Sequence, residues 1–492
     1  MSGTVTVPGY SDSNRVPGFY FNLDNSKANT ASVARRVLIV AQMVAGIGIA
    51  GVATISGGYS DAVAKYGASS QCAAMVEAYR KIDTQGELWV LPLADEESGQ
   101  SAAGTFTISG TATSAGTLSL YVGDQLVSVG VASGDTATTV AANAVAAALN
   151  VSGLPVSAKA AAGVVTFTAL NKGQSGNDIL LGVSLLGTGG GQAIPAGLSV
   201  VASSMQGGTT NPTNLATVLS SQGERVYDLI LHPYTDSGSL TAFKNWLDGT
   251  SGRWAPTAQL YGHAITAYRG TYGQATAFGQ TLNDPHETVM PISDSPSSPL
   301  IWAAQIGAQV AISMRTNPAL PVTGLSLTVM PPTDAGRFIR DERNSLLYDG
   351  LATFTVDDSG TVYIERLVTT YQTNASGVAD NSYLDIETLL TAEICMQDMR
   401  IYLASHYGRC ILVADNTKIP AGAQATTAAL IGKAAASRYR FQATQFWVQN
   451  PDNFAQNLVA ENAGNGLVKL LLPYDFANQL RVIAGNVQFT KS

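Results

Sequence analysis

Charge is the scarcest feature of this 492-residue chain. Only 13% of the residues are Asp, Glu, Lys or Arg, whereas 46% are hydrophobic. Soluble domains usually carry about a quarter of charged residues, so the surface of this protein is unusually neutral. A neutral surface rich in Gly, Ala, Ser and Thr favours a chain that buries much of itself against other chains. A stable extracellular β-protein with a neutral surface is the alternative interpretation.

Basic residues form no cluster, and Arg35-Arg36 is their densest pair. The formal net charge of the chain is −8. A general nucleic-acid binder needs grouped Lys and Arg side chains to neutralise phosphates. We therefore expect no direct contact with nucleic acid.

Long apolar runs are missing as well. The segment 37–55 comes closest to the roughly 20 residues that span a bilayer, but Gln42, Thr54 and several glycines interrupt it. Residues 1–18 contain no apolar stretch of the kind that a secretory signal needs. We expect no membrane insertion and a protein that folds in a cytosol.

Cysteine is rare, and the three cysteines are widely separated: Cys72, Cys395 and Cys410. An odd number at such spacing indicates buried free thiols and not a disulfide framework. Histidine is equally rare, and the four histidines are His232, His263, His286 and His406. They occur in no H-E-x-x-H pattern, and the chain has no C-x-x-C, so we expect no metal and no cofactor. A site shared by His232 and Asp236 is conceivable only as a chance pairing of a strand end with a turn.

Three glycines imitate a nucleotide-binding motif. Gly46, Gly48 and Gly51 spell G-x-G-x-x-G after an apolar run. A dinucleotide site needs these glycines to open a helix, but here they lead into the β-like segment 52–56. We interpret them as a glycine-rich loop. Gly432-Lys433 lacks the upstream glycine of a phosphate loop, since position 427 is Thr.

The length of the chain predicts two to four domains. Predicted strands and helices alternate along much of the sequence. An apolar run at 33–42, helical segments over 60–82 and a second run at 87–92 predict a parallel α/β unit. The helix over this region places Cys72, Met75, Val76 and Tyr79 on one face. The same alternation returns in three more strands and three more helices, which we place at 227–234, 240–247, 263–268, 272–282, 288–292 and 299–314. The last of them has Ser298 as its cap and Pro299 at its first position, and its apolar composition on all sides predicts burial.

Residues 101–205 break this alternation. Short β-rich segments separated by Gly and Ser turns fill most of it, with one Ala-rich helix over 136–149 and further strands at 164–170 and 179–186. We interpret this segment as an inserted β-rich domain, because a long insertion costs little when it enters a surface loop whose ends lie close together.

The stretch 346–408 organises the rest. Its first part, with a turn at 357–360, predicts a β-hairpin that ends in the strand 361–371. A loop follows, and Ser382 or Asp385 can cap a long helix that begins near residue 384. Apolar residues at helical spacing predict that one face of this helix is buried. Downstream, we expect a short strand at 411–413, a helix at 426–441 and strand-like alternation at 468–472 and 480–489.

Four of these segments together resemble the tail sheath proteins of contractile phages, of the Mu-like kind. They are 65–95, 348–374, 377–400 and 470–489, and they occur in the order that the family has. The resemblance covers most of the chain. It implies a fold class: an α/β core that is subtilisin-like and catalytically inert, with an inserted β-rich domain, an α+β C-terminal domain and extended terminal arms.

The expected organisation has five parts. They are an N-terminal linking arm (1–32), a discontinuous α/β core (33–100 and 206–345), the inserted outer domain (101–205), an α+β C-terminal domain (346–478) and a C-terminal linking arm (479–492). The arms are expected to add strands to the sheets of neighbouring subunits. Their candidate contact residues are Phe19, Tyr20, Phe21, Leu23, Leu480, Val482, Ile483, Val487 and Phe489.

No catalytic triad is visible. No histidine precedes Gly-Thr, Ser203-Ser204 lies outside a G-T-S motif, and the Asp-Ser-Gly sequences at 236–238 and 358–360 are typical of turns. We therefore expect no enzyme. A degenerate subtilisin-like hydrolase and another self-assembling surface or adhesive protein are the alternatives.

The resemblance implies a subunit that polymerises as stacked hexameric rings around a tail tube and contracts to drive the tube through the host envelope. The implied partners are further copies of the chain, the tail tube protein, and baseplate and tail terminator proteins. The implied place is the tail of the virion, assembled in the host cytoplasm.

Overall fold

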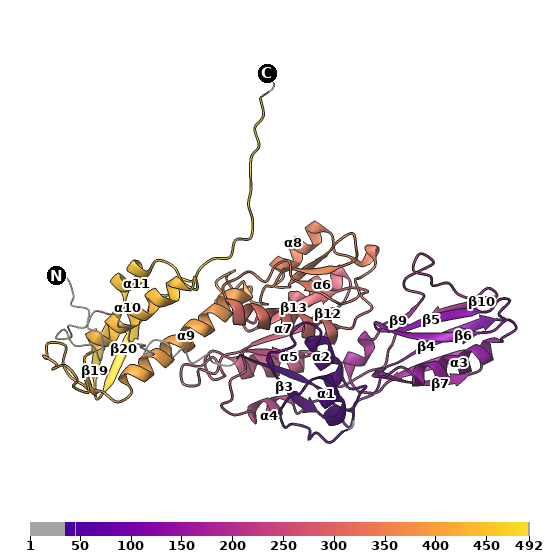
Figure 1. The fold of residues 1–492 in the computed structure, drawn as a ribbon, viewed down its shortest axis with the longest axis horizontal. Helices are drawn as coiled ribbons and strands as arrows, with labels where there is room; N and C mark the ends of the chain where they lie inside the picture. The colour runs from indigo at the N-terminus through magenta and orange to yellow at the C-terminus, as the bar shows by residue number, and fades with distance from the viewer. Residues whose placement is uncertain (1–34, 45, 491–492) are drawn as a thin grey trace, which may run out of the picture. The chain divides into compact units, whose positions relative to one another are not determined.

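The computed structural model describes residues 35–44 and 46–490. A six-stranded sheet with the order β13-β12-β11-β1-β3-β2 lies at its centre (Figure 1). Five strands are parallel, and β2 pairs antiparallel with β3 at the edge. The strands are β1 (Arg36–Gln42), β2 (Thr54–Ile55), β3 (Glu87–Leu93), β11 (Leu229–Leu231), β12 (His263–Arg269) and β13 (Glu287–Ile292).

Helices cover both faces of this sheet. They are α1 (Tyr59–Tyr66), α2 (Gln71–Arg80), α4 (Leu215–Ser220), α5 (Ser237–Leu247), α6 (Tyr272–Gly279) and α7 (Pro299–Thr316). Alternate residues of β1 face opposite ways: Val37 and Ile39 join the cluster that contains α2 and α7, and Leu38 joins the cluster that contains α4 and α5. Both faces are therefore apolar, as the continuous hydrophobic runs predict.

Helix α7 is buried along most of its length, which confirms the prediction from its composition. Its closest approach to the sheet is at Gly307, where a Cβ atom would lie 2.2 Å from Leu231 Cδ2. Ser298 occupies the N-cap position, but its side chain makes no capping hydrogen bond.

 The hydroxyl of the neighbouring Ser297 accepts a hydrogen bond from the Met330 amide and donates one to Asp124 Oδ2. Pro299 and the Ser298 backbone therefore mark the start of α7 without a side-chain cap.

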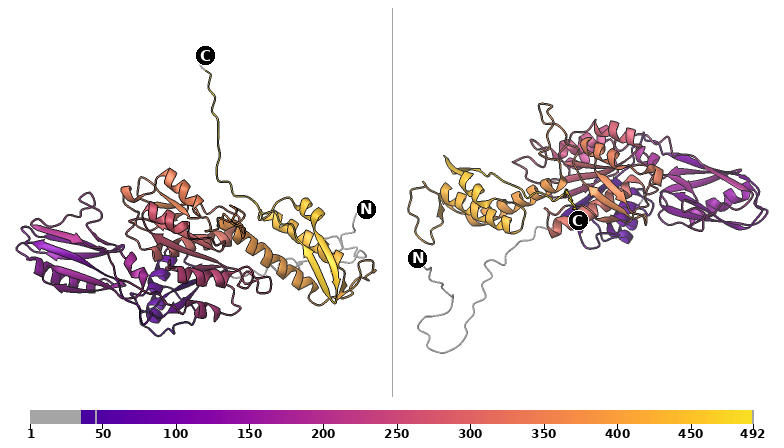
Figure 2. Two further views of the ribbon diagram at one scale, coloured as in Figure 1. Left: turned by 180° about the vertical axis from the view of Figure 1, so that it is seen from behind. Right: turned by 90° about the horizontal axis from the view of Figure 1, so that it is seen from above.

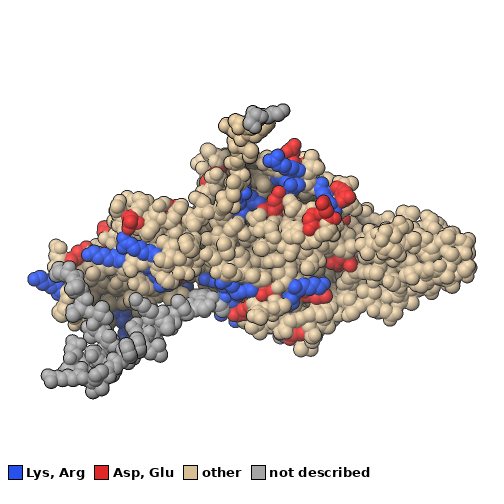
Figure 3. Space-filling model, turned by 45° about the horizontal axis from the view of Figure 1, so that its top comes forward, with Lys and Arg blue, Asp and Glu red and all other residues tan. Residues whose placement is uncertain are grey.

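A separate set of strands follows β3 and surrounds its own hydrophobic cluster. Two antiparallel sheets, β10-β4-β8-β7 and β6-β5-β9, and helix α3 form this part. Their bounds are β4 (Ala103–Gly110), β5 (Gly116–Val122), β6 (Gln125–Val131), α3 (Ala137–Leu149), β7 (Val156–Ala161), β8 (Val164–Ala169), β9 (Leu181–Val183) and β10 (Leu198–Ala202). Figure 3 shows hardly any charged side chain over these strands on the face in view.

The two ends of this β-rich segment lie side by side. An isolated antiparallel bridge joins Gln100 to Thr209, and a second joins Ala103 to Gln206. Helix α3 begins after Thr136, whose hydroxyl accepts from the Thr139 amide, and it ends at Asn150, as predicted. The strand predicted at 179–186 is shorter than expected, since only Leu181–Val183 pairs with a neighbour.

One correction concerns the start of the hairpin at 346–371. Residues 346–348 are not extended: they end helix α8 (Arg340–Tyr348), whose first turn is fixed by the Ile339 amide donating to Glu342 Oε2 at 2.9 Å. The hairpin itself consists of β15 (Thr353–Val356) and β16 (Val362–Arg366), and β14 (Ser326–Leu327) pairs with β16. The Leu351 amide bonds to the Leu346 carbonyl, which turns the chain from helix to strand.

The predicted long helix is α9 (Ile386–Tyr407), and its first half joins the main core while its second half joins another cluster (Figure 2). The prediction of a single buried face is wrong for the first half. Glu387, Glu393 and Gln397 are buried there together with the apolar residues. The remaining elements are β17 (Ile411–Leu412), β18 (Ala425–Thr426), α10 (Ala428–Thr444), α11 (Pro451–Asn457), β19 (Val459–Gly464) and β20 (Leu467–Leu471).

Candidate functional site

The C-terminal segment is attached to the body as far as residue 481 and no further. The Gln449 amide donates to the Asp475 carbonyl at 2.9 Å, and the Ala477 amide donates to the Trp447 carbonyl at 3.1 Å. Gln479 Nε2 then donates to the Ala319 carbonyl at 3.3 Å. Residues 482–490 are all exposed and belong to no strand. Figures 1 and 2 show the chain leaving the folded body there without returning to it.

Several of these exposed side chains are large and apolar. The side chains concerned are Leu480 at 71% exposure, Val482 at 80%, Ile483 at 83%, Val487 at 89% and Phe489 at 87%. The predicted strand over 480–489 thus has no strand partner within the described part of the chain. The N-terminal candidates Phe19, Tyr20, Phe21 and Leu23 lie outside the described residues.

A second exposed feature is the hairpin of β19 and β20, of which the sequence analysis found only the second strand. Val459 pairs with Leu471 and Asn462 pairs with Val468. The turn residues Asn465 and Gly466 have φ values of 51° and 75°. Asn-Gly with both φ values positive is the signature of a type I′ hairpin turn, so the sequence did contain a signal that was missed.

One face of this hairpin packs on α10. A Cβ atom at Gly432 would lie 2.9 Å from Leu458 Cδ2 and 3.0 Å from Ala460 Cβ, so Gly432 allows the close approach. The opposite face is exposed, with Val459 at 52%, Leu467 at 51% and Leu471 at 62%. Among residues 35–44 and 46–490, neither outer edge of the hairpin has a strand partner.

The histidines lie apart in places that suit packing. His232 is buried, its ring stacks on Phe243 with centroids 3.9 Å apart, and its Nε2 atom lies 3.3 Å from Glu287 Oε1. His263 Nε2 lies 2.9 Å from Thr288 Oγ1. His286 stacks on Trp254 with centroids 4.6 Å apart.

Burial decides the charge state of the His232–Glu287 pair. It raises the pKa of Glu287 to about 8 and lowers the pKa of His232 to about 3. Both side chains are therefore uncharged near pH 7, and they form no ion pair. The site that His232 and Asp236 could share is not formed, because the Asp236 carboxylate accepts hydrogen bonds from the Ser239 amide and from Asn211 Nδ2.

The hydroxyl groups of Ser203 and Ser405 are engaged in hydrogen bonds with other groups. Ser203 Oγ accepts from the Thr105 amide at 2.8 Å. Ser405 Oγ lies 3.0 Å from His406 Nδ1, but both side chains also contact the Tyr402 carbonyl at the exposed end of α9. Cys72 and Cys395 are buried free thiols, as predicted, and burial raises the pKa of both. Among the described residues, no three His, Cys, Asp or Glu side chains are grouped as a metal site would require.

The glycine-rich loop also has a packing explanation. A Cβ atom at Gly46 would lie 2.2 Å from the Lys65 carbonyl oxygen, and one at Gly48 would lie 2.7 Å from it. Gly51 has a φ of 81°, which favours glycine. The loop needs these glycines to pass the end of α1. No helix begins at the loop, since β2 follows it.

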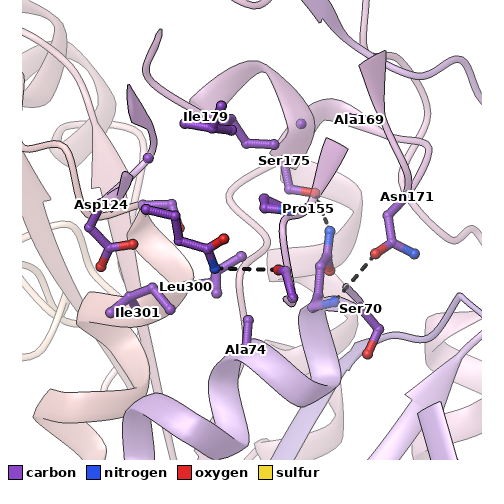
Figure 4. A pocket seen from close by; sticks show the side chains of 17 residues that line it. Ser70, Ala74, Asp124, Pro155, Ala169, Asn171, Ser175, Ile179, Leu300 and Ile301 are labelled. Carbon is purple, nitrogen blue, oxygen red and sulfur yellow. Dashed lines mark hydrogen bonds between the residues drawn. The ribbon is translucent and has the colours of Figure 1, made fainter. Parts of the chain in front are cut away.

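A pocket lies where α2 and the start of α7 meet the β-rich segment (Figure 4). Gln71 Nε2 donates to Ser175 Oγ at 2.7 Å, and Gln125 Nε2 donates to the Gly153 carbonyl at 3.3 Å. The Gln71 amide donates to Asn171 Oδ1 at 3.3 Å. The two bonds of Gln71 cross the junction, whereas the bond of Gln125 lies within the β-rich segment, and no histidine lines the pocket. The arrangement fixes the junction and contains no nucleophile with a base.

No helix among residues 35–44 and 46–490 combines the length and the hydropathy that crossing a bilayer requires.

Comparison with known proteins defines the class. The family model described as the phage tail sheath protein central domain matches residues 207–370. A chain in a structure of the anti-feeding prophage baseplate aligns with a TM-score of 0.50 at 10% identity, over 97% of this chain and 99% of that one. A sheath tail protein from Desulfitobacterium hafniense aligns with a TM-score of 0.49 at 12% identity, over 94% of this chain and 97% of that one. The matched domain is that of phage tail sheath proteins, a class of structural subunits.

A full-length relative makes the membership specific. The Mu-like prophage FluMu tail sheath protein of Haemophilus influenzae is 32% identical over 480 residues, which are 96% of this chain and 97% of that protein. The chain therefore belongs to the family of Mu-like phage tail sheath proteins, which confirms the resemblance found in the sequence. It is a structural component of a contractile phage-like tail.

The buried Glu287 predicts a pH dependence of stability. Its pKa in the folded state, about 8, lies above the ordinary value of 4.5. The contribution of the protonated Glu287 carboxyl to the stability of the folded state is thus complete below pH 4.5. This contribution is lost as the pH rises through about 8. We expect the free energy of unfolding of the unassembled subunit to fall between about pH 5 and pH 8, by at most about 1.4 kcal/mol per pH unit for this group, and to level off above pH 8.

Glu287→Gln, which keeps the shape and removes the titration, should flatten this part of the profile in denaturant unfolding. Glu365→Gln is the control, since Glu365 is a partly exposed partner of Arg343 and should leave the profile unchanged. Equal profiles for Glu287→Gln and the wild type would contradict the assignment.

Proposed function

We propose that this chain is the repeating sheath subunit that polymerises around a tail tube and is linked to its neighbours by its terminal segments, 1–32 and 479–492. The observation that carries the proposal is the exposed, uncharged segment 482–490, whose apolar side chains Val482, Ile483, Val487 and Phe489 are each at least 80% exposed. Exposed apolar strands are a pairing hazard that natural proteins usually cover. An exposed run without charged residues from 482 to 489 suits a strand that a neighbour covers.

The hairpin of β19 and β20 is the proposed acceptor. A two-stranded sheet is marginally stable by itself, and each of its edges offers a row of backbone N–H and C=O groups. An arm strand added to either edge would satisfy these groups and would extend the sheet on α10. The exposed Val459, Leu467 and Leu471 would then lie beside the apolar side chains of the arm.

Strand addition also suits contraction. Backbone hydrogen bonds between strands depend little on side-chain chemistry, so they survive while the bodies that they join move as rigid units. We infer stacked hexameric rings whose subunits rotate and move outward while the arms keep the lattice connected, driving the tube into the host envelope. The tube, baseplate and terminator proteins are the proposed further partners, and the host cytoplasm is the proposed place of assembly.

The proposed division of the body follows the resemblance, and the hydrophobic clusters support it in part, since several residues of 346–394 pack in the main cluster with the α/β part. The α/β part at 33–100 and 206–345 would be the sheath core, with the subtilisin-like layout that the resemblance implies. Residues 346–478 would be the C-terminal sheath domain. Residues 101–205 would be an inserted outer domain, which the separate cluster of β4 to β10 and α3 supports.

Removing the C-terminal arm tests the linkage. A chain that ends at Gln479 should remain a folded monomer but should no longer form long tubes, because the strand that bridges subunits is gone. Removal of residues 1–25 should have the same effect. Size-exclusion chromatography and electron microscopy measure both properties.

The matched control removes only Lys491 and Ser492, which should leave tube formation unchanged. Tubes of normal length from either arm truncation would show that domain faces alone hold the assembly.

Deleting residues 101–205 tests the insertion. The bridge between Gln100 and Thr209 places the two ends together, so a short Gly-Ser joint closes the gap without strain. We expect a folded remainder with some loss of stability, because Asn171 Nδ2 no longer donates to Asp95 Oδ1, a bond of 3.0 Å. Remainders that are unfolded by circular dichroism with several joint designs would sink the proposed division.

We also propose that the subunit has no catalytic activity, since Ser203 and the three buried histidines are engaged in hydrogen bonds or aromatic contacts. Incubation with broad protease and esterase substrates should show no turnover. Turnover that disappears with Ser204→Ala, or with replacement of one histidine, would revive the hydrolase alternative.

A further inference from the structure

One side chain in the exposed C-terminal run is held by the body. Every residue from 482 to 490 is exposed and Leu480 is 71% exposed, whereas the side chain of Arg481 is only 16% exposed. Its guanidinium makes three contacts: Nη2 donates to Glu387 Oε2 at 2.7 Å and to Asp385 Oδ1 at 3.1 Å, and Nη1 donates to Thr323 Oγ1 at 3.0 Å. The next residue along the chain has no such contact.

The two carboxylates that hold Arg481 stand at the start of α9. Asp385 is the N-cap residue, yet its side chain caps no amide, because Arg366 binds it through two hydrogen bonds of 2.9 and 3.0 Å. Glu387 is fully buried, and its Oε1 atom accepts from the Val322 amide at 2.7 Å. Arg481 is the cation that pairs with its other oxygen.

We propose that Arg481 is a positioning residue that clamps the root of the C-terminal arm to the start of α9, so that the arm moves toward a neighbouring subunit only from residue 482 onward. This inference rests on the proposed linking function of the arm and adds where the arm is anchored and how far it extends.

The burial of Glu387 keeps the clamp closed. A carboxylate removed from water is strongly disfavoured unless a cation or hydrogen bonds compensate it. Burial raises the pKa of Glu387, and the charge of Arg481 opposes that rise. Release of Arg481 would leave a buried carboxylate with the Val322 amide alone, so pulling on the arm is resisted at residue 481.

The clamp sets a reach. Nine described residues, 482–490, follow Arg481. An extended chain advances about 3.3–3.6 Å per residue, so these nine residues reach roughly 30–32 Å from the root. The acceptor edge on a neighbour must lie within that distance of Arg481 in both states of the tail, and a released root would lengthen the reach and loosen its direction.

Two variants separate anchoring from stability. Arg481→Met removes the cation, so the melting temperature of the soluble subunit should fall by several degrees. The double variant Glu387→Gln with Arg481→Met also removes the buried charge and should recover most of that loss, while the arm root stays released. In both variants, hydrogen exchange at 477–481 should rise at least tenfold at the Ala477 amide, which donates to the Trp447 carbonyl.

Assembly is the second measurement. If the clamp positions the arm, the stable double variant should still form fewer and shorter tubes than the wild type. Arg337→Met is the matched control: it breaks a pair with Asp334, which is 90% exposed, so tubes and exchange should not change. Arg481→Lys keeps one charged contact and should restore part of the tube length.

The outcomes are distinct. Unchanged exchange at 477–481 in Arg481→Met, or normal tubes from a double variant whose exchange is raised, overturns the clamp. Normal tubes from the chain that ends at Gln479 would overturn the linking function of the arm instead, and the exchange measurement on the free subunit would still decide whether the root is held.

Discussion

The pairing of buried charges around α9 is the interaction on which the rest of the structure depends. This helix joins two hydrophobic clusters and carries Glu387 and Glu393 into the interior. Glu393 accepts from Gln397, and Arg35 bridges Gln397 to Asp228 next to the sheet. Breaking a buried pair by removing one partner costs about 3–5 kcal/mol, so these contacts fix α9 to the core. A chain with few charged residues thus uses several of them to hold α9 against the core.

Local patterns in the sequence predicted the elements well and their pairing poorly. The apolar run at 33–42 became β1, Pro299 marked the start of α7, and Thr136 and Asn150 bounded α3, because each depends on neighbours in the chain. The position of β2 at the sheet edge depends on contacts distant in sequence, which no local pattern contains. Helix α8 was missed because the apolar residues at its end, Leu346 to Tyr348, imitate a strand.

The candidate site, too, was predicted from the sequence only where it depends on local patterns. Alternation and lack of charge were enough to mark 480–489 as a strand awaiting a partner, and Asn465-Gly466 could have revealed the hairpin. The role of Arg481 was beyond sequence reasoning, since its carboxylate partners are 94 and 96 residues away. The four histidines were candidates from residue type alone. Three of them are buried in aromatic or strand contacts, and burial lowers their pKa so that they stay uncharged.

A contractile subunit must combine a body that does not deform with links that do. In the body, close contacts such as Gly307 against Leu231 leave no space for sliding, and buried ion pairs resist separation. The proposed links use backbone hydrogen bonds, which keep their geometry whatever bodies they join. The boundary between the rigid body and the linking arm would be a single peptide unit. On one side of it the side chain of Arg481 is held, and on the other the side chain of Val482 is exposed. A sharp boundary of this kind lets each body rotate about the root of its arm without pulling α9 out of the core.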